Sequence, residues 1–270
     1  MLVPHLSAFG DEIDPDLTTQ LALLESEGIR ALELRAAWGV NVVELDAAQL
    51  RRARDELRAR GFAVSAIASP VGKSGLEQPP AYEAARLDRA IAAAEALDCR
   101  LIRVFSFYVN STAPDAARGA VLERMAALAA RAERAGVLLV HENERGIYGE
   151  TPERCRDLLN GVGSPALRQA FDPANFVQAG VRPLARAWPL RAADVAHVHI
   201  KDARLADGAV VPAGEGDGEI GGLLAALAAR GYQGYLTLEP HLAVAGPAGG
   251  FSGAEGMRRA VRALRRLLDA

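Results

Sequence analysis

Four side chains that can bind a metal ion fall at or just after the ends of four short apolar runs, which we interpret as buried strands. They are Glu142, Asp172, His199 and Glu239. In a closed parallel barrel the carboxyl ends of the strands surround one mouth, so all four side chains would reach one ion there. Three carboxylates and one imidazole suit a divalent ion such as Mn²⁺, Mg²⁺ or Co²⁺, whereas a structural zinc site would use cysteines or more histidines.

Taken singly, each carboxylate also has a simpler interpretation. Glu142 could pair with Arg145 at the rim, Asp172 could form an Asp-Pro turn, and Glu239 could stand at the start of a helix. The hypothesis of a site therefore depends on the four residues occurring at successive strand ends, from the fifth strand to the eighth.

Two histidines and a lysine alternate along the seventh expected strand, so they lie on one of its faces. His199 is nearer the mouth and is the better ligand, whereas His197 would lie one layer deeper and serve the structure. Lys201 continues the same face and is a candidate for binding a substrate oxygen.

Other charged residues also stand near expected strand ends. We predict substrate-binding roles for Glu33, at the end of the second strand, and for Arg145. Lys73 and Arg103 could hold substrate oxygens as well, but we interpret them as solvated charges on the rim.

Two familiar motifs are excluded. Residues 216–221 match G-x-G-x-x-G, but acidic side chains within and beside them would repel a pyrophosphate. His141 and Glu142 begin like H-E-x-x-H, but Arg145 occupies the second histidine position and the segment is expected to be a strand. The glycine-rich loop 214–219 is expected either to pack over the barrel mouth or to be an ordinary solvated connection.

Strand-like and helix-like segments alternate along the whole chain without a linker or a change of composition. The expected strands are residues 2–9, 29–34, 62–68, 101–107, 137–140, 167–171, 195–200 and 235–238. The expected helices include 16–27, 45–60, 80–97, 115–135, 183–190 and 254–268, with Thr151 as the cap of a helix that begins at Pro152. Eight such units predict an α/β protein, a single-domain (β/α)8 TIM barrel over residues 1–270, with an open doubly wound sheet as the alternative.

The composition limits the possible partners. The chain has 270 residues, of which 50% are hydrophobic, and a formal net charge of −3, which argues against a nucleic-acid surface. Its two cysteines form no C-x-x-C pair and suggest free thiols in a reducing compartment. We found no signal-peptide pattern and no apolar stretch long enough to span a bilayer, so we expect a cytoplasmic protein without a membrane partner.

Several segments, in order, resemble a known family. HENERGIYGETPERC, FDPANF, HVHIKDA, GEGDGEI and LEPHL, together with FGDEI, LELR and ASPVGK nearer the amino terminus, are similar to the sugar phosphate isomerase/epimerase group of xylose isomerase-like TIM barrels. The resemblance covers nearly the whole chain and is most specific between Val137 and His241.

The resemblance implies one divalent metal ion, most often Mn²⁺, bound by the set Glu142, Asp172, His199 and Glu239. It also implies that Glu142 and Glu239 exchange the substrate proton, as the two metal-bound glutamates do in the ketose epimerases of the group. Asn175 stands three residues after the aspartate, where those epimerases use a histidine to hold the sugar. This departure weakens the case for a ketose 3-epimerase.

We therefore predict a metal-dependent isomerase or epimerase that acts on a sugar, a cyclitol or a related polyhydroxy carbonyl compound through an enediolate. A dehydratase on the same scaffold is the alternative, because inosose and dehydroshikimate dehydratases share it. A binding protein without turnover would not need both glutamates, and the related apurinic endonucleases need more histidines than the five present here. The oligomeric state is left open, with a homodimer as one option.

Overall fold

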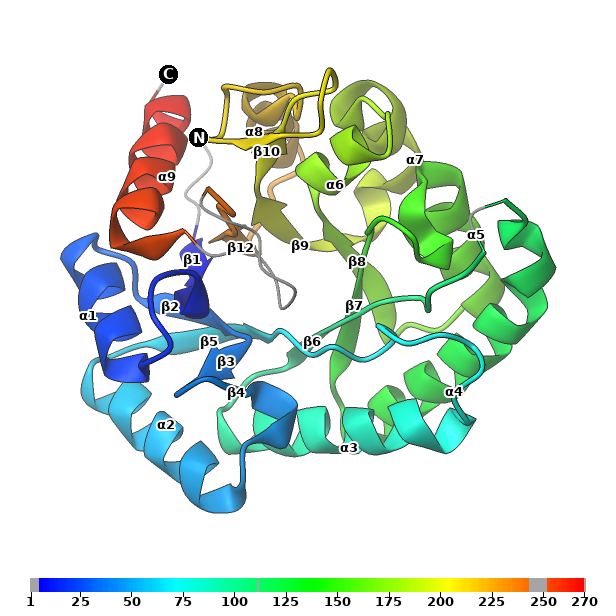
Figure 1. Cartoon of the computed structure of the whole chain (residues 1–270), viewed down its shortest axis with the longest axis horizontal. Coiled ribbons are helices and arrows are strands. Elements are labelled where there is room, and N and C mark those ends of the chain that lie inside the picture. Colours follow the sequence, from blue (N-terminus) through cyan, green and yellow to red (C-terminus); the bar gives the residue numbers. More distant parts are fainter. Residues whose placement is uncertain (1–4, 111, 243–251, 270) are drawn as a thin grey trace.

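The computed structural model describes residues 5–110, 112–242 and 252–269, and in them eight parallel strands close into a barrel (Figure 1). The barrel strands are β1 His5–Phe9, β2 Ala31–Leu34, β5 Ala63–Ile67, β6 Leu101–Val104, β7 Leu138–Glu142, β8 Leu167–Phe171, β9 Val195–Ile200 and β12 Tyr235–Leu238. Their order around the barrel is β1, β12, β9, β8, β7, β6, β5 and β2. The predicted TIM barrel is confirmed, while residues 2–4 of the first expected strand lie outside the described part of the chain.

Helices surround the barrel on the outside (Figure 1). They are α1 Leu17–Ser26, α2 Ala47–Ala59, α3 Pro80–Ala96, α4 Arg118–Ala135, α5 Pro152–Val162, α6 Pro173–Gln178, α7 Trp188–Arg191, α8 Ile220–Ala229 and α9 Gly253–Leu268. The predicted start of α5 is confirmed, because the Thr151 side chain accepts a hydrogen bond from the backbone of Arg154 and Pro152 is the first helical residue. Within the described ranges, none of these helices has the length and apolar character needed to cross a membrane.

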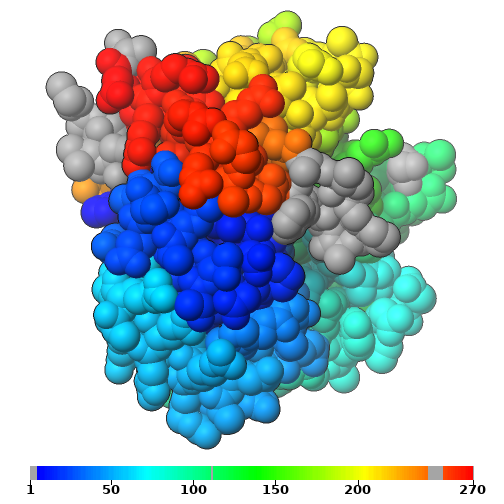
Figure 2. Space-filling model, turned by 60° about the vertical axis from the view of Figure 1, so that its left-hand side comes forward, coloured from blue at the N-terminus to red at the C-terminus, as the bar shows by residue number. Residues whose placement is uncertain are grey.

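The first and last helices lie side by side where the barrel closes, as the blue and red surfaces in Figure 2 show. Arg258 and Arg265 of α9 both form ion pairs with Glu27, the residue directly after α1. Strand pairing closes the same seam inside, since β1 pairs with β12 in parallel over His5–Ala8. The chain thus brings the carboxyl end of β12, which carries Glu239, next to the amino-terminal units.

Three elements differ from the expectation. In the expected helix 183–190, residues Pro183–Ala187 form a π-helical turn and α7 covers only Trp188–Arg191. The fourth strand was predicted for 101–107 but ends at Val104. Beyond it the backbone pairs with the segment that follows β5, because the backbone N–H groups of Phe105 and Phe107 donate to the carbonyl groups of Val71 and Gly72, respectively. The short helix α6 was not predicted; it begins directly after β8, with the Asp172 side chain capping it through the backbone of Asn175.

The glycine-rich loop is bound to the chain segment that follows β9. One carboxylate, Asp202, accepts hydrogen bonds from the backbone of Gly214, Gly216 and Gly218 at 2.7 to 3.1 Å. A Cβ atom on Gly216 would lie 2.5 Å from Asp202 and from the Ala203 carbonyl oxygen, so the loop approaches too closely for any larger residue. The loop is therefore held against the segment after β9 rather than free in solvent, and its residues are not among those that line the mouth pocket described below.

Both cysteine side chains are buried, and burial raises the pKa of Cys99 and of Cys155 to about 12. A thiol with such a pKa is almost entirely protonated at neutral pH and is a poor nucleophile. We therefore expect a disulfide reagent such as Ellman's reagent to modify neither cysteine of the native protein within minutes at pH 8, and to titrate two thiols after unfolding in guanidinium. Rapid stoichiometric modification of the native protein would contradict this burial.

Candidate active site

The four metal-competent side chains identified from the sequence come together at the mouth of the barrel. Glu142 is the last residue of β7, His199 is the penultimate residue of β9, and Asp172 and Glu239 directly follow β8 and β12. All four are buried, and one ligand atom from each lies within 4.8 Å of the others. Because β12, β9, β8 and β7 are consecutive neighbours in the barrel, their carboxyl ends bring the four side chains to one place.

His199 directs one ring nitrogen at the three carboxylates. Its Nδ1 lies 3.4 Å from Glu142 Oε1, 3.7 Å from Glu239 Oε2 and 3.8 Å from Asp172 Oδ2. In the part of the chain that the structure describes, His199 Nδ1 and Asp172 Oδ2 have no hydrogen-bond partner of good geometry. A ring lone pair and three anionic groups that face one point repel each other unless a proton or a cation lies between them, so this donor set fits a divalent ion.

Basic side chains surround the same carboxylates. Lys201 Nζ lies 2.9 Å from Asp172 Oδ2 and 3.1 Å from Glu239 Oε2, and Arg103 Nη1 lies 3.3 Å from Glu142 Oε2. The contact of Lys201 with Asp172 is an ion pair whose angle departs from that of a hydrogen bond. Our interpretation of Arg103 as a solvated rim charge is wrong, because its side chain is buried and pairs with a site carboxylate.

These charges hold the two glutamates in the ionised form. Burial alone would raise the pKa of Glu142 and Glu239, but neighbouring positive charges outweigh it. Without a bound ion, His199 and Arg103 lower the pKa of Glu142, and Lys201 and His241 lower that of Glu239. Asp172, Glu239 and Glu142 in turn raise the pKa of Lys201 above its usual value despite its burial, so the amine remains an ammonium ion.

Two asparagines fix the positions of Glu142 and Asp172. Asn143 donates from Nδ2 to the backbone carbonyl of Asp172 and accepts from its backbone N–H, which ties the ends of β7 and β8 together. Asn175 donates from Nδ2 to Glu142 Oε1 at 3.0 Å and to the Asn143 carbonyl at 2.9 Å. Asn175 thus holds a site carboxylate in place, and Asn143 is a contributor that the sequence analysis missed.

Two of the predicted substrate-binding residues lie elsewhere. Arg145 is exposed and lines a separate shallow hollow with Glu150 and Gln178. Glu33 is completely buried below the metal-competent set, where it contacts His197 and His199. The deeper position predicted for His197 is confirmed, since its side chain is fully buried and contacts Glu33.

A pocket of about 360 Å³ opens above the four side chains. Glu142, Glu239 and Lys201 face it, and most of its other charged lining is basic: Arg35, Lys73, Arg103 and His241. Arg35 follows Glu33 by two residues, so strand alternation could have placed both on one face, but its contacts with Asp11 and Glu239 come from distant parts of the chain.

Comparison with known proteins agrees with this geometry. Residues 21–269 match the profile of the family described as Xylose isomerase-like TIM barrel. The chain is 32% identical to the 2-epi-5-epi-valiolone 7-phosphate 2-epimerase of an Actinoplanes species, over 76% of this chain and 78% of that one.

Solved structures show the same fold. The probable 3-DHS dehydratase AsbF from Bacillus anthracis superposes with a TM-score of 0.78 at 15% identity, covering 96% of this chain and 98% of that one. A D-tagatose 3-epimerase-like protein superposes with a TM-score of 0.77 at 17% identity, covering 98% and 97%. At these identities the likeness extends to the fold alone.

Proposed function

This chain belongs to the xylose isomerase-like TIM barrel family, and from that premise we propose that it is a divalent-metal-dependent epimerase or isomerase of a sugar or cyclitol. The observation that carries the proposal is the convergence of Glu142 and Glu239 on one donor set at the floor of a polar pocket. The epimerase relative is named for a 7-phosphate substrate, and the basic side chains around the pocket would also suit an anionic substrate.

Glu142, Asp172, His199 and Glu239 would hold the ion, and Mn²⁺ is the best candidate, with Mg²⁺ and Co²⁺ as alternatives. The ion would supply Lewis-acid polarisation of the substrate carbonyl, which acidifies the adjacent C–H bond. That help is needed, because the lowered pKa values make both glutamates weak bases.

In the proposed reaction one glutamate accepts the proton from the carbon next to the carbonyl, which gives an enediolate. The other glutamate takes up a proton from water and delivers it to the opposite face of the same carbon in an epimerase, or to the neighbouring carbon in an isomerase, while the first glutamate returns its proton to water. Lys201 and Arg103 stay charged throughout and can donate hydrogen bonds to substrate oxygens, since both line the pocket. No atoms are gained or lost in the net reaction.

A dehydratase remains the second candidate, because Asn175 occupies the position where the ketose epimerases of the group have a histidine. In that reaction the enediolate would expel a β-hydroxyl group instead of taking back a proton. His241 lines the pocket, and although burial opposes it, the charge of Glu239 raises the pKa of His241 to about 9. This imidazolium could therefore protonate the leaving hydroxyl.

The test incubates the protein and Mn²⁺ in D₂O with a panel of ketoses, cyclitols and their phosphates. NMR and mass spectrometry then measure the deuterium content of each compound and any loss of water. Deuterium in recovered or epimerised substrate supports the proposal, and loss of water supports the dehydratase. Failure of every compound to exchange or dehydrate would contradict both reactions for the classes tested.

Removal of the metal is expected to abolish activity. Mn²⁺ or Co²⁺ should restore turnover better than Ca²⁺, because Ca²⁺ prefers six to eight oxygen ligands and this set offers an imidazole and few oxygens. The measurement is turnover after dialysis against EDTA and after addition of each ion, with metal content determined in parallel. Full activity in metal-free protein would refute the metal requirement.

A further inference from the structure

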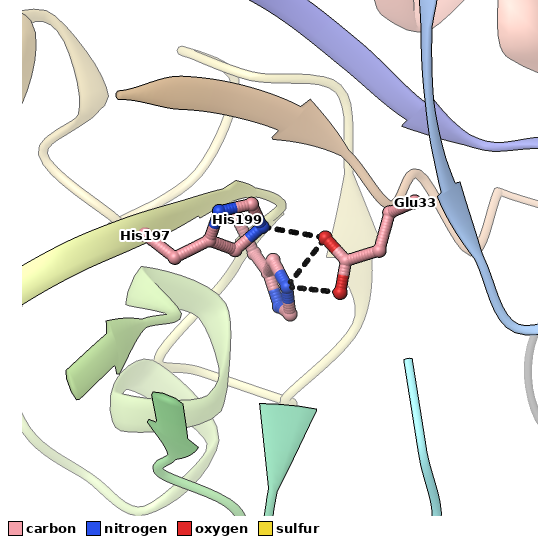
Figure 3. Close-up of side chains that lie close together, drawn as sticks. All are labelled: Glu33, His197 and His199. Carbon is pink, nitrogen blue, oxygen red and sulfur yellow. Dashed lines mark hydrogen bonds and ion pairs between the residues drawn. The ribbon is translucent and has the colours of Figure 1, made fainter. Parts of the chain in front are cut away.

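Glu33 of β2 lies directly beneath the metal-competent set and contacts two imidazoles at once (Figure 3). Its Oε2 is 2.6 Å from His197 Nε2, and its Oε1 is 3.3 Å from His199 Nε2. All three side chains are inaccessible to solvent. β2 and β9 are not neighbours in the barrel, so these contacts cross its interior.

The charge of Glu33 depends on the two rings. Among the described residues its ion-pair partners are His197 and His199, with no lysine or arginine. A buried carboxylate is costly unless hydrogen-bond donors satisfy it, so each ring has to present an N–H group to Glu33.

A hydrogen on His199 Nε2 has a consequence for the other side of the ring. In neutral imidazole only one nitrogen carries a proton, so Nδ1 is then left with a free lone pair. This is the nitrogen that lies 3.4 Å from Glu142 and within 3.8 Å of the other two carboxylates. The contact with Glu33 therefore selects the tautomer that a cation at the mouth requires.

Neighbouring rings prevent His199 from turning away. Phe9 meets it edge-on with ring centroids 5.3 Å apart, and His197 meets it at 89° with centroids 5.4 Å apart. His197 is itself held by Glu33 and by Thr237, whose Oγ1 lies 3.1 Å from His197 Nε2.

We propose that Glu33 is a positioning residue that fixes His199 as the Nε2–H tautomer and directs its Nδ1 lone pair at the metal ion, with His197 bracing Glu33. This rests on the proposed metal-dependent function and replaces the substrate-binding role predicted for Glu33 from the sequence. A carboxylate behind a metal-binding histidine raises its basicity and fixes its orientation, and its loss weakens metal affinity by about 10- to 100-fold.

The test is a titration of Glu33→Gln with Mn²⁺ in the absence of substrate. Binding is measured from the electron paramagnetic resonance signal of the Mn²⁺ that stays free. Gln has the same size but one acceptor oxygen and no charge, and its NH₂ group would face an imidazole N–H. We expect the dissociation constant to rise by about 10- to 100-fold. The control is Thr237→Val, which removes the other contact of His197 but leaves Glu33 and His199 intact and should change the constant by less than about two-fold. Equal Mn²⁺ affinity in Glu33→Gln and wild type would overturn the proposal.

A second measurement needs no variant and stays decisive if Glu33→Gln does not fold. Long-range ¹H–¹⁵N spectra of the Mg²⁺-loaded wild type can resolve its five histidines. His199 should carry a proton on Nε2 and none on Nδ1, whereas a proton on Nδ1 in the loaded protein would refute the assigned tautomer.

The two proposals fail in different ways. If Glu33→Gln weakens Mn²⁺ binding but no sugar or cyclitol reacts, the positioning role stands and the reaction is wrong. If a substrate is turned over but Glu33→Gln binds Mn²⁺ normally, the reaction stands and the positioning role is wrong. A wild type that binds no Mn²⁺ overturns both.

Discussion

Turnover is expected to fall by roughly 100- to 10,000-fold in Glu142→Gln and in Glu239→Gln, because each replacement removes a group that accepts or donates the substrate proton. Gln keeps the volume and one ligand oxygen, so part of the metal affinity should remain. Its amide cannot take up a proton near neutral pH, however high the metal concentration is raised. Substrate binding should change far less than turnover, since neither variant alters the basic lining of the pocket.

The measurement is the turnover rate of each variant at saturating Mn²⁺, with metal content determined on the same sample. Glu144→Gln is the matched control, because it makes the same chemical change two residues after Glu142. Glu144 also lines the pocket, but it pairs with Lys73 and does not belong to the metal-competent set. We expect it to change turnover by less than about ten-fold. Normal turnover of metal-loaded Glu142→Gln would show that Glu142 carries no proton.

The geometry of the candidate site follows from patterns that are local in the sequence. Apolar runs such as 137–140 mark buried strands, and a polar residue at the end of each run has to lie at the barrel mouth. For that reason the convergence of Glu142, Asp172, His199 and Glu239 could be anticipated before any side chain was placed. His197 could be placed below His199 because it shares a face with His199 and comes two residues earlier in the strand, farther from the mouth.

Other features depended on partners that are remote in the chain. Arg103 looked like a rim charge because nothing near it in sequence shows that it reaches Glu142, 39 positions away. Arg35 lies just beyond the end of β2, two residues after Glu33, yet Glu33 points inward to His197 and His199 while Arg35 pairs with Asp11 and Glu239. Alternation gives the face of a strand but not the depth in the barrel, which tertiary packing decides.

Helix α6 and the attachment of the glycine-rich loop were not anticipated, for a related reason. Each depends on a different aspartate, Asp172 for α6 and Asp202 for the loop, and the two oxygens of Asp172 have separate tasks. Asp202 gathers three backbone N–H groups of the loop, so a connection that looks flexible becomes fixed. Asp172 uses Oδ1 to cap α6 and turns Oδ2 toward His199 and Lys201. A sequence pattern assigns one role to such a residue, either turn or ligand, whereas the structure uses it for both.

The double role of Asp172 gives the last prediction. Asp172→Asn keeps an oxygen that can cap α6, because asparagine is as good a cap as aspartate, but it removes the negative charge that faces the ion. We expect Mn²⁺ to bind at least about 100-fold more weakly, which corresponds to about 2.8 kcal/mol. Raising Mn²⁺ should then recover much of the turnover, in contrast to the two glutamate variants, because Asp172 is assigned no proton to transfer.

Asp172→Ala separates the two tasks of this side chain. It loses the charge and also the cap. Without metal, its free energy of unfolding should therefore be about 1 kcal/mol lower than that of Asp172→Asn. Mn²⁺ binding should be as weak as in the asparagine variant or weaker. The measurements are urea unfolding in EDTA and Mn²⁺ titration of both variants beside the wild type. If Asp172→Asn binds Mn²⁺ as tightly as the wild type, Asp172 is only a helix cap and the ion has no more than three protein ligands from this set.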